Sequence, residues 1–244
     1  MALLCAAVGT GWAHESATGE MDSTKRAVQS SRFRHWSLGV SAGMDRNYHT
    51  VDMSYMSDME FTKYEEGYSL GAQFSYRPLR LLSVRLDAVL LNKNYRMDHV
   101  KQLQSVRYYT YTLTENSYVH VPLTVALNVG RVVRVSVFGG VYGGYWLTSH
   151  RSGESLSLSS RVYGDETVNA FDEDVVFDEQ RDNRRDAGFV WGAGVCAALL
   201  DRIELGAEVR WYYSTQDIQM EYQRGLNPRY NTTMVLQAGV SFCL

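Results

Sequence analysis

No stretch of this 244-residue sequence is long enough and apolar enough to form a transmembrane helix. Such a helix needs about 18 consecutive apolar residues, and no run of that length follows the N-terminal segment. The formal net charge of −3 provides no basic surface for nucleic acid. We therefore expect neither a membrane-spanning helix nor a nucleic-acid partner.

The motifs of common catalytic and metal-binding sites are also missing. The sequence has no paired-cysteine zinc spacing, no glycine-rich phosphate loop and no nucleophile elbow. Seven acidic residues fall between 165 and 179, but their spacing is not that of a calcium-binding loop. The sequence thus predicts no catalytic residue, no cofactor and no metal site, and it predicts a solvated acidic loop.

The N-terminal segment has the pattern of a secretory signal. Residues 2–13 (ALLCAAVGTGWA) are mostly apolar and end in a small residue. No basic residues precede them, which leaves open an upstream start or an apolar terminus that is not cleaved. We predict a signal peptide over residues 1–13 and a flexible periplasmic lead over residues 14–35.

Eight later stretches alternate apolar residues with small or polar ones. In the first, Trp36, Leu38 and Val40 alternate with Ser37 and Gly39. A period of two predicts β-strands. The predicted strands cover residues 36–44, 68–76, 82–92, 118–129, 132–146, 187–199, 202–213 and 233–244.

One face of every predicted strand carries no charged residue, whereas the other face holds glycine, serine and six charges. A soluble barrel or sandwich, the alternative, would hide its large apolar side chains and expose lysine and glutamate. A membrane barrel reverses this arrangement. The predicted fold class is all-β: a transmembrane, antiparallel, up-and-down β-barrel of eight strands, forming one domain over residues 36–244.

The connections alternate between short and long. The short ones cover residues 77–81, 130–131 and 200–201, and the long ones cover 45–67, 93–117, 147–186 and 214–232. Outer-membrane barrels have short periplasmic turns and long extracellular loops. We therefore expect a Gram-negative outer-membrane protein with both termini in the periplasm. The third long connection alternates at 155–159 and 174–177, which predicts a hairpin above the membrane; ten spanning strands are the alternative.

Aromatic residues fall near both ends of the predicted strands, where the membrane interfaces should lie. Amphipathic rings prefer this depth and form two girdles. The predicted girdle residues are Trp36, Tyr76 and Phe242 at one end, and Tyr68, Tyr145, Trp191, Trp211 and Tyr213 at the other. Pro122 stands in mid-strand and cannot donate to the ladder, so we expect a bulge or a missing hydrogen bond there.

Charged residues on the inward face are the candidate site. They are Arg85, Asp87, Arg134, Glu204, Glu208 and Arg210, joined by His120, which we expect near Tyr118 and Glu204. An eight-stranded barrel is only wide enough for its own side chains, and buried charges persist chiefly when paired. We predict a plug of ion pairs, with a gated narrow pore as the alternative.

The two cysteines of the predicted barrel, Cys196 and Cys243, fall on strands that are two apart. Such strands lie roughly 9–10 Å from each other, beyond the usual limit of about 7 Å between the Cα atoms of a disulfide. We expect two free thiols that fill inward-facing positions.

Four segments, in this order, resemble the PorT-type group of small, porin-like outer-membrane β-barrel proteins of Gram-negative bacteria: 118–123 (YVHVPL), 138–145 (FGGVYGGY), 186–194 (DAGFVWGAG) and 204–212 (ELGAEVRWY). The sequence departs from the family pattern at His120, where a carboxylate is usual, and at Leu244, where the family ends in an aromatic residue. The resemblance implies a barrel, and one branch of the family is linked to protein secretion.

These patterns predict a non-enzymatic structural or interaction protein whose extracellular loops form a binding surface. The alternatives are a narrow small-solute channel and an accessory component of a secretion system. The outward face lacks the Ser, His, Asp and Glu that a lipid-modifying enzyme would need there. The expected partners are outer-membrane lipid, the barrel-assembly machinery during insertion, and an extracellular or secretion-system protein, and we expect a monomer.

Overall fold

The computed structural model describes residues 34–51, 59–103, 106–159, 166–220 and 229–244. The predicted signal peptide and almost all of the predicted periplasmic lead lie outside these residues. Within them the chain forms antiparallel β-strands, and no helix there could cross a membrane. The strands are β1 (Trp36–Val51), β2 (Met59–Tyr76), β3 (Leu82–Asn92), β4 (Tyr95–Leu103), β5 (Val106–Gly130), β6 (Val133–Ser159), β7 (Glu166–Asp174), β8 (Arg185–Ala198), β9 (Ile203–Ser214) and β10 (Arg229–Cys243).

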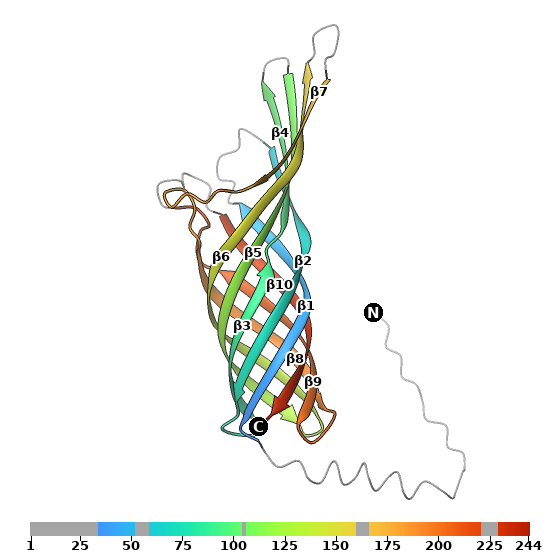
Figure 1. The fold of residues 1–244 in the computed structure, drawn as a ribbon, viewed down its shortest axis with the longest axis vertical. Helices are drawn as coiled ribbons and strands as arrows, with labels where there is room; N and C mark the ends of the chain where they lie inside the picture. The colour runs from blue at the N-terminus through green and yellow to red at the C-terminus, as the bar shows by residue number, and fades with distance from the viewer. Residues whose placement is uncertain (1–33, 52–58, 104–105, 160–165, 221–228) are drawn as a thin grey trace, which may run out of the picture. The chain divides into compact units, whose positions relative to one another are not determined.

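The strands close into a barrel with eight positions around its wall (Figure 1). Most strands pair with their neighbours in the chain, β6 also pairs with β8, and β10 pairs with β1 to complete the ring. β3 and β4 share one position, because both lie between β2 and β5. In the described part of the chain, β7 pairs only with β6, beyond the barrel wall. The predicted fold class is therefore confirmed.

The break between β3 and β4 consists of Lys93 and Asn94. Its backbone stays connected to β5, because the Lys93 N–H donates to the Asn116 carbonyl at 2.9 Å. The Asn94 side chain replaces a ladder bond by accepting from the Asn116 N–H at 3.1 Å. The interruption therefore lets Lys93 enter the barrel without leaving these backbone groups unpaired.

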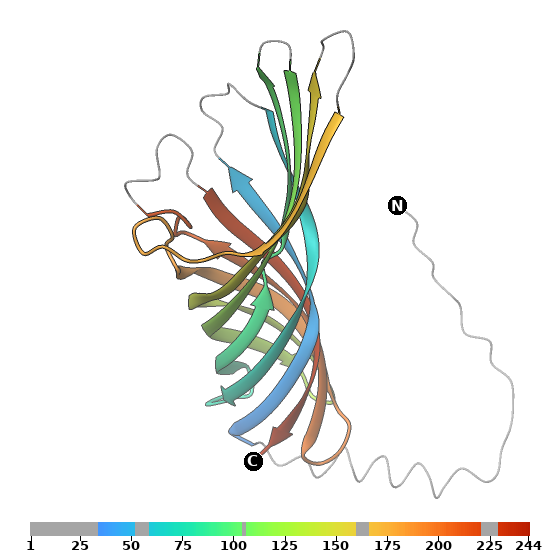
Figure 2. The ribbon, with the colours of Figure 1, turned by 45° about the horizontal axis from the view of Figure 1, so that its top comes forward.

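The predicted membrane-crossing strands match the structure to within one residue wherever they end at a short connection. The prediction of long loops at the other end is wrong, because most of those residues continue as strand. β6 has 27 residues and β5 has 25, whereas a strand needs only about 9–11 to cross a bilayer. The excess forms a sheet beyond the barrel, made of residues 59–64, 95–103, 106–116, 149–159 and 166–174 (Figure 2). We call it the outer sheet.

The predicted hairpin exists, but its second arm is misplaced. Its first arm is the end of β6, as expected, and it pairs with β7 over residues 166–174 rather than 174–177. Val175, Val176 and Phe177 follow the end of that strand. The physical reason is that β7 lies beyond the barrel wall, where side chains on both of its faces are exposed, so its sequence need not alternate between apolar and polar residues.

The outer face of the barrel is apolar and exposed along its height. On β9, for example, Leu205 and Tyr213 are exposed, whereas the alternate residues Arg210 and Tyr212 are buried. The first outward charges on β1 and β2 are Arg46 and Glu66, which form an ion pair just beyond the Met44–Tyr68 register pair. This uncharged band is the surface that hydrocarbon coats in a membrane barrel.

Pro122 interrupts one ladder without bulging the strand. β5 keeps its pairing with β6 through Pro122 and Tyr142. Its pairing with β3 stops at Leu86–Leu123 and resumes in the same register at Val89–His120. The lost ladder contact agrees with the missing N–H of proline.

The turn after β5 requires a glycine at position 130. Gly130 has φ +119°, and a Cβ there would clash with the Val133 carbonyl oxygen. Only glycine tolerates this conformation and this approach. The turn reverses the chain in two residues and brings Arg134 onto the inward face of β6.

Candidate functional site

The barrel interior near the short turns is built around Glu204 on β9. Its carboxylate forms an ion pair with Arg134 of β6 and lies 3.3 Å from a guanidinium nitrogen of Arg77. Arg77 also donates to the Cys243 sulfur at 3.2 Å, and Arg134 donates to the Cys196 sulfur at 3.3 Å. Both cysteines are free, as predicted, and both line this layer.

The next layer joins two acids and two arginines. Arg210 lies 2.6 Å from Asp87, and Arg85 lies 2.8 Å from Glu208. Two further contacts connect these pairs. Glu208 also accepts a hydrogen bond from Arg210 at 2.6 Å, and Asp87 lies 3.8 Å from Arg85. Both guanidinium groups sit over the Phe138 ring. Each charge therefore has two partners of opposite sign.

A polar cavity of about 110 Å³ occupies this half of the barrel. It is large enough for several water molecules but smaller than the roughly 300–1,000 Å³ of pockets that hold small-molecule ligands. Its charged lining consists of Arg77, Arg85, Arg134, Glu204, Glu208 and Arg210.

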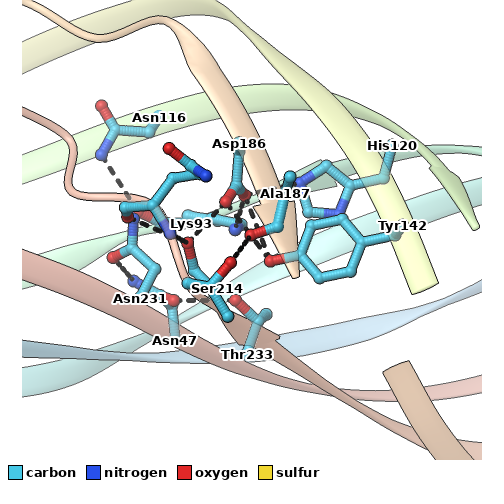
Figure 3. A network of polar contacts seen from close by, with 12 residues as sticks. Asn47, Lys93, Asn116, His120, Tyr142, Asp186, Ala187, Ser214, Asn231 and Thr233 are labelled. Atoms are coloured by element: carbon cyan, nitrogen blue, oxygen red, sulfur yellow. Dashed lines mark hydrogen bonds and ion pairs between the residues drawn. The ribbon is translucent and has the colours of Figure 1, made fainter. Parts of the chain in front are cut away.

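The other half of the barrel interior is organised by Asp186 on β8 (Figure 3). Its carboxylate forms an ion pair with Lys93 and lies 3.1 Å from Nε2 of His120. It also accepts hydrogen bonds from Ser214 at 2.6 Å and from the Tyr142 hydroxyl at 3.3 Å. Lys93 is 1% exposed and His120 is fully buried, so this cluster is isolated from solvent.

Aromatic rings surround the cluster and close the lumen at this level. His120 stacks on Tyr142 at 4.6 Å and meets the edge of Tyr212 at 5.3 Å. Tyr118 stacks on Trp146 at 5.6 Å. The tyrosine and tryptophan rings belong to one buried apolar cluster that also contains Val89, Leu91, Val190 and Val235.

A layer of amide and hydroxyl groups from β1 and β10 lies beside the Asp186 cluster (Figure 3). Thr233 donates to the Asn47 side chain at 2.8 Å, and Asn47 donates to Asn231 at 3.2 Å. All three residues are buried. The interior at this level is thus filled by side chains that hydrogen-bond one another.

Ser214, His120 and Asp186 are the residue types of a hydrolytic triad, but their arrangement is different. In a triad the serine contacts the histidine, which in turn contacts the acid. Here Ser214 and His120 both contact the same carboxylate. Because all three are buried, the geometry supports a structural network. No group of metal-ligating side chains is arranged to hold an ion in the described part of the chain.

The structure places all six predicted inward charges inside the barrel and joins them in the two layers described above. His120 also points inward and meets Tyr118, as expected. The expected contact of His120 with Glu204 is wrong, because Glu204 lies in the layer next to the short turns and His120 lies beside Asp186. The stagger between strands decides which layer an inward residue occupies, and a single sequence does not display it.

Sequence reasoning missed Lys93, Asp186, Arg77 and Ser214. Each lies at most two residues outside a predicted strand and continues that strand's inward alternation. Asp186, for example, precedes the inward Gly188 by two positions. Extending the alternation beyond the apolar residues would have found them.

The predicted girdle residues all lie on the outer face and form two groups. At the short-turn end, the ring of Trp36 packs on that of Tyr76 with 4.2 Å between their centroids. Phe242 pairs with Leu38, two residues along β1 from Trp36. At the other end, Trp191 stacks on Trp211 at 4.5 Å, and Tyr68, Tyr145 and Tyr213 are exposed. Their role as membrane girdles remains a prediction.

The outer sheet carries an exposed acidic site at its β6–β7 edge. His150 places one ring nitrogen 2.8 Å from Asp174 and the other 2.8 Å from Asp172. The hydrogen bond with Asp174, aided by the charges of Asp172 and Glu115, raises the pKa of His150 above its ordinary value of 6.5. A hollow of about 360 Å³ lies on the sheet, between residues such as Tyr95, Phe171 and Arg151.

Comparison with known proteins gives a family match and a set of fold neighbours. The neisserial surface protein NspA is 12% identical over 86% of this chain and 97% of its own, with a TM-score of 0.42. OprG of Pseudomonas aeruginosa is 12% identical over 88% and 98%, with a TM-score of 0.49. Ail, the attachment invasion locus protein of Yersinia pestis, is 14% identical over 86% and 100%, with a TM-score of 0.38.

No curated protein matches the sequence. The family model described as outer membrane protein beta-barrel domain matches residues 27–219, which is most of the chain. With the closed, outwardly apolar barrel described above, this match places the protein in the outer membrane of Gram-negative bacteria. The chain belongs to the outer membrane protein beta-barrel domain family.

Proposed function

We propose that this protein is a non-enzymatic surface receptor or adhesion module: a closed barrel that anchors the outer sheet outside the cell as a binding surface. The observation that carries this proposal is the length of the strands. β5 and β6 continue for more than twice the length needed to cross a membrane. The excess is folded and paired, so it provides a rigid surface rather than a loose loop.

The open edge of the outer sheet supports this role. Among the described residues β7 pairs on one side only, and an unpaired edge is a template for strand addition. Its side chains are exposed and acidic at Asp172, Glu173 and Asp174, with Val168 exposed between polar neighbours. Such an edge favours an extended partner segment with basic side chains.

The proposed orientation follows from the connections. Strands joined by short turns at one end and by an extended sheet at the other match the asymmetry of outer-membrane barrels. We therefore place both termini and the short turns in the periplasm and the outer sheet outside. Cysteine substitutions at Val168 and Arg131, labelled on intact cells with a membrane-impermeant maleimide, test this. We expect labelling at position 168 alone. Labelling at position 131 alone would show that the protein has the opposite orientation.

Deletion of the hairpin tests the binding role. Residues 152–172 are replaced by a two-residue turn, which leaves the lipid-facing band intact. A photo-crosslinking residue at position 168 of the full-length protein identifies the partner on intact cells, and the purified partner is then titrated against both forms. Loss of binding on deletion, with unchanged binding of an Arg85→Gln variant, is expected. The reverse pattern would overturn the proposal.

A narrow small-solute channel is the second candidate, and the polar cavity favours it. Against it, the Asp186 cluster and its aromatic shell fill the lumen beyond the cavity. Planar-bilayer recordings separate the two functions. The closed barrel predicts no steady openings in the wild type. Openings whose ion selectivity changes in Arg85→Gln or Glu208→Gln would establish the channel instead.

The PorT-type assignment and the accessory role in secretion rest on the four sequence segments alone. They are tested by isolating the protein from solubilised membranes and identifying secretion components that remain stably bound to it.

We also propose that the barrel is a monomer, inserted by the barrel-assembly machinery. Because β10 pairs with β1, the ring of strands has no open edge onto which a second copy could add a strand.

A further inference from the structure

Charge is divided unequally between the two ends of the barrel. The short-turn end carries six arginines and two acidic residues, a net charge of +4: Arg34, Arg77, Arg80, Arg131, Arg134 and Arg202 against Asp201 and Glu204. The connections at the other end, residues 45–67, 93–117, 147–186 and 214–232, carry 13 Lys or Arg and 20 Asp or Glu, a net charge of −7. The basic end is therefore not a consequence of overall composition, because the whole chain is acidic at −3.

The arginines of this end face two different environments. Arg77 and Arg134 point into the barrel and bind Glu204. Arg80, Arg131 and Arg202 are exposed, one on each short turn. We call these three residues the arginine rim. The guanidinium of Arg202 lies 6.0 Å from the Phe242 ring, at the level where the uncharged band ends.

Exposed aliphatic side chains accompany the arginine rim on every turn. Leu79 and Leu81 flank Arg80, and each is 62% exposed. Leu199 and Leu200 precede Arg202 with 61% and 62% exposure, and Val132 follows Arg131 with 44%. Large aliphatic groups so close to water are unfavourable unless acyl chains cover them. The turns are thus suited to the depth of the lipid headgroups.

This pairing of aliphatic and guanidinium groups has a defined ligand chemistry. Arginine near a membrane surface buries its stem in the apolar region and holds its head at phosphate level. The planar guanidinium then donates two hydrogen bonds to a phosphate. An anionic phospholipid gains from each such arginine, whereas a zwitterionic lipid carries a compensating positive group. The rim is continuous with the lipid-facing band, so lipid already adjoins it.

We propose that the arginine rim is a binding surface for anionic phospholipid headgroups, of the phosphatidylglycerol class, in the leaflet at the short-turn end. Identifying that leaflet as the periplasmic one rests on the orientation given under Proposed function; the lipid preference itself does not. The rim would hold the barrel at a fixed depth in the membrane and select its neighbouring lipids.

The test uses Trp36 as a reporter, because it lies at the same end of the barrel as the rim. The protein with Trp12, Trp146, Trp191 and Trp211 replaced by Phe is reconstituted in vesicles. Quenching is measured with brominated phosphatidylglycerol or brominated phosphatidylcholine mixed into unbrominated phosphatidylcholine. Each rim arginine is worth roughly a fivefold preference for an anionic surface, so we expect at least tenfold selectivity for phosphatidylglycerol at low salt, reduced by 0.5 M NaCl.

Two triple variants in that background separate the rim from total charge. Arg80→Gln, Arg131→Gln and Arg202→Gln together should reduce the selectivity to within twofold. Arg46→Gln, Arg151→Gln and Arg185→Gln remove the same charge at the other end and should leave it unchanged. If the single-tryptophan protein does not insert, native mass spectrometry of the full-tryptophan protein with the two lipids gives the same comparison.

Equal affinity for the two lipids in the wild-type rim would overturn the proposal, as would an equal loss of selectivity in both triple variants. Arginine-dependent retention on purified peptidoglycan without any lipid preference would also overturn it, by assigning the rim to a different partner. The hairpin deletion should retain the lipid selectivity, so failure of this inference and failure of the proposed surface function are distinguishable.

Discussion

The two halves of the barrel interior bury charge in different ways. Near the short turns, each arginine or acid has more than one oppositely charged partner or belongs to a shared network, around a polar cavity that can hold several water molecules. In the other half, Lys93 is the one Lys or Arg partner of Asp186 among the described residues, and this pair lies inside an aromatic shell. A shared network tolerates the loss of one member better than an isolated pair does, because a remaining partner can compensate the charge that is left. The isolated pair should therefore be the more fragile of the two.

Removing Lys93 should have the largest effect. Lys93→Met leaves the Asp186 carboxylate buried without its cation, which should lower the free energy of unfolding by about 3–5 kcal/mol. Urea unfolding in lipid vesicles, followed by tryptophan fluorescence, measures the change. The double variant Lys93→Met with Asp186→Leu removes both charges and should recover most of the loss. A single variant as stable as the wild type would show that the pair is not isolated.

Removing one member of the network should cost less. In Glu208→Gln, Arg85 and Arg210 keep Asp87 as a partner, so we expect a loss of about 1–3 kcal/mol. The same unfolding measurement applies. If Glu208→Gln proved more damaging than Lys93→Met, the comparison between the two halves would be reversed.

The exposed ion pairs of His150 should have the smallest effect and depend on pH. Its raised pKa means that protonated His150 stabilises the β6–β7 pairing, fully below about pH 6.5, and that this contribution is lost as the pH rises through the raised pKa. Hydrogen exchange of β7 amides, corrected for the intrinsic rate, should be slower at pH 5.5 than at pH 8.5. His150→Gln should abolish the difference. The same pH dependence in the variant would assign it to other groups.

The alternation of the sequence predicts the barrel because lipid imposes one rule on every outward residue. β3 shows this best: residues 82–92 were predicted, and the strand covers Leu82–Asn92. Beyond the lipid both faces meet water, and the rule no longer holds. β4 reads Tyr-Arg-Met-Asp-His-Val-Lys-Gln-Leu, so nothing in its polarity separates it from a loop.

The candidate site was predicted in part for a related reason. The alternation of side chains along each strand shows that Arg85, Glu208 and His120 point inward. It does not show at which height they meet residues of other strands, which is why His120 was expected at Glu204 instead of Asp186. Lys93 was missed because it occupies the break between β3 and β4, where the apolar pattern stops.

The central claim is that hydrocarbon coats the uncharged outer face while charges and polar groups fill the inside. It is tested most directly by spin labels placed one at a time on Leu236, Gln237, Ala238, Gly239 and Val240 of β10, in protein whose Cys5, Cys196 and Cys243 are replaced by Ser and reconstituted in liposomes. The account predicts that relaxation by molecular oxygen, which concentrates in acyl chains, alternates with period two and peaks at positions 236, 238 and 240. Uniform accessibility along the segment, or greater relaxation there by a water-soluble nickel chelate than by oxygen, would contradict it.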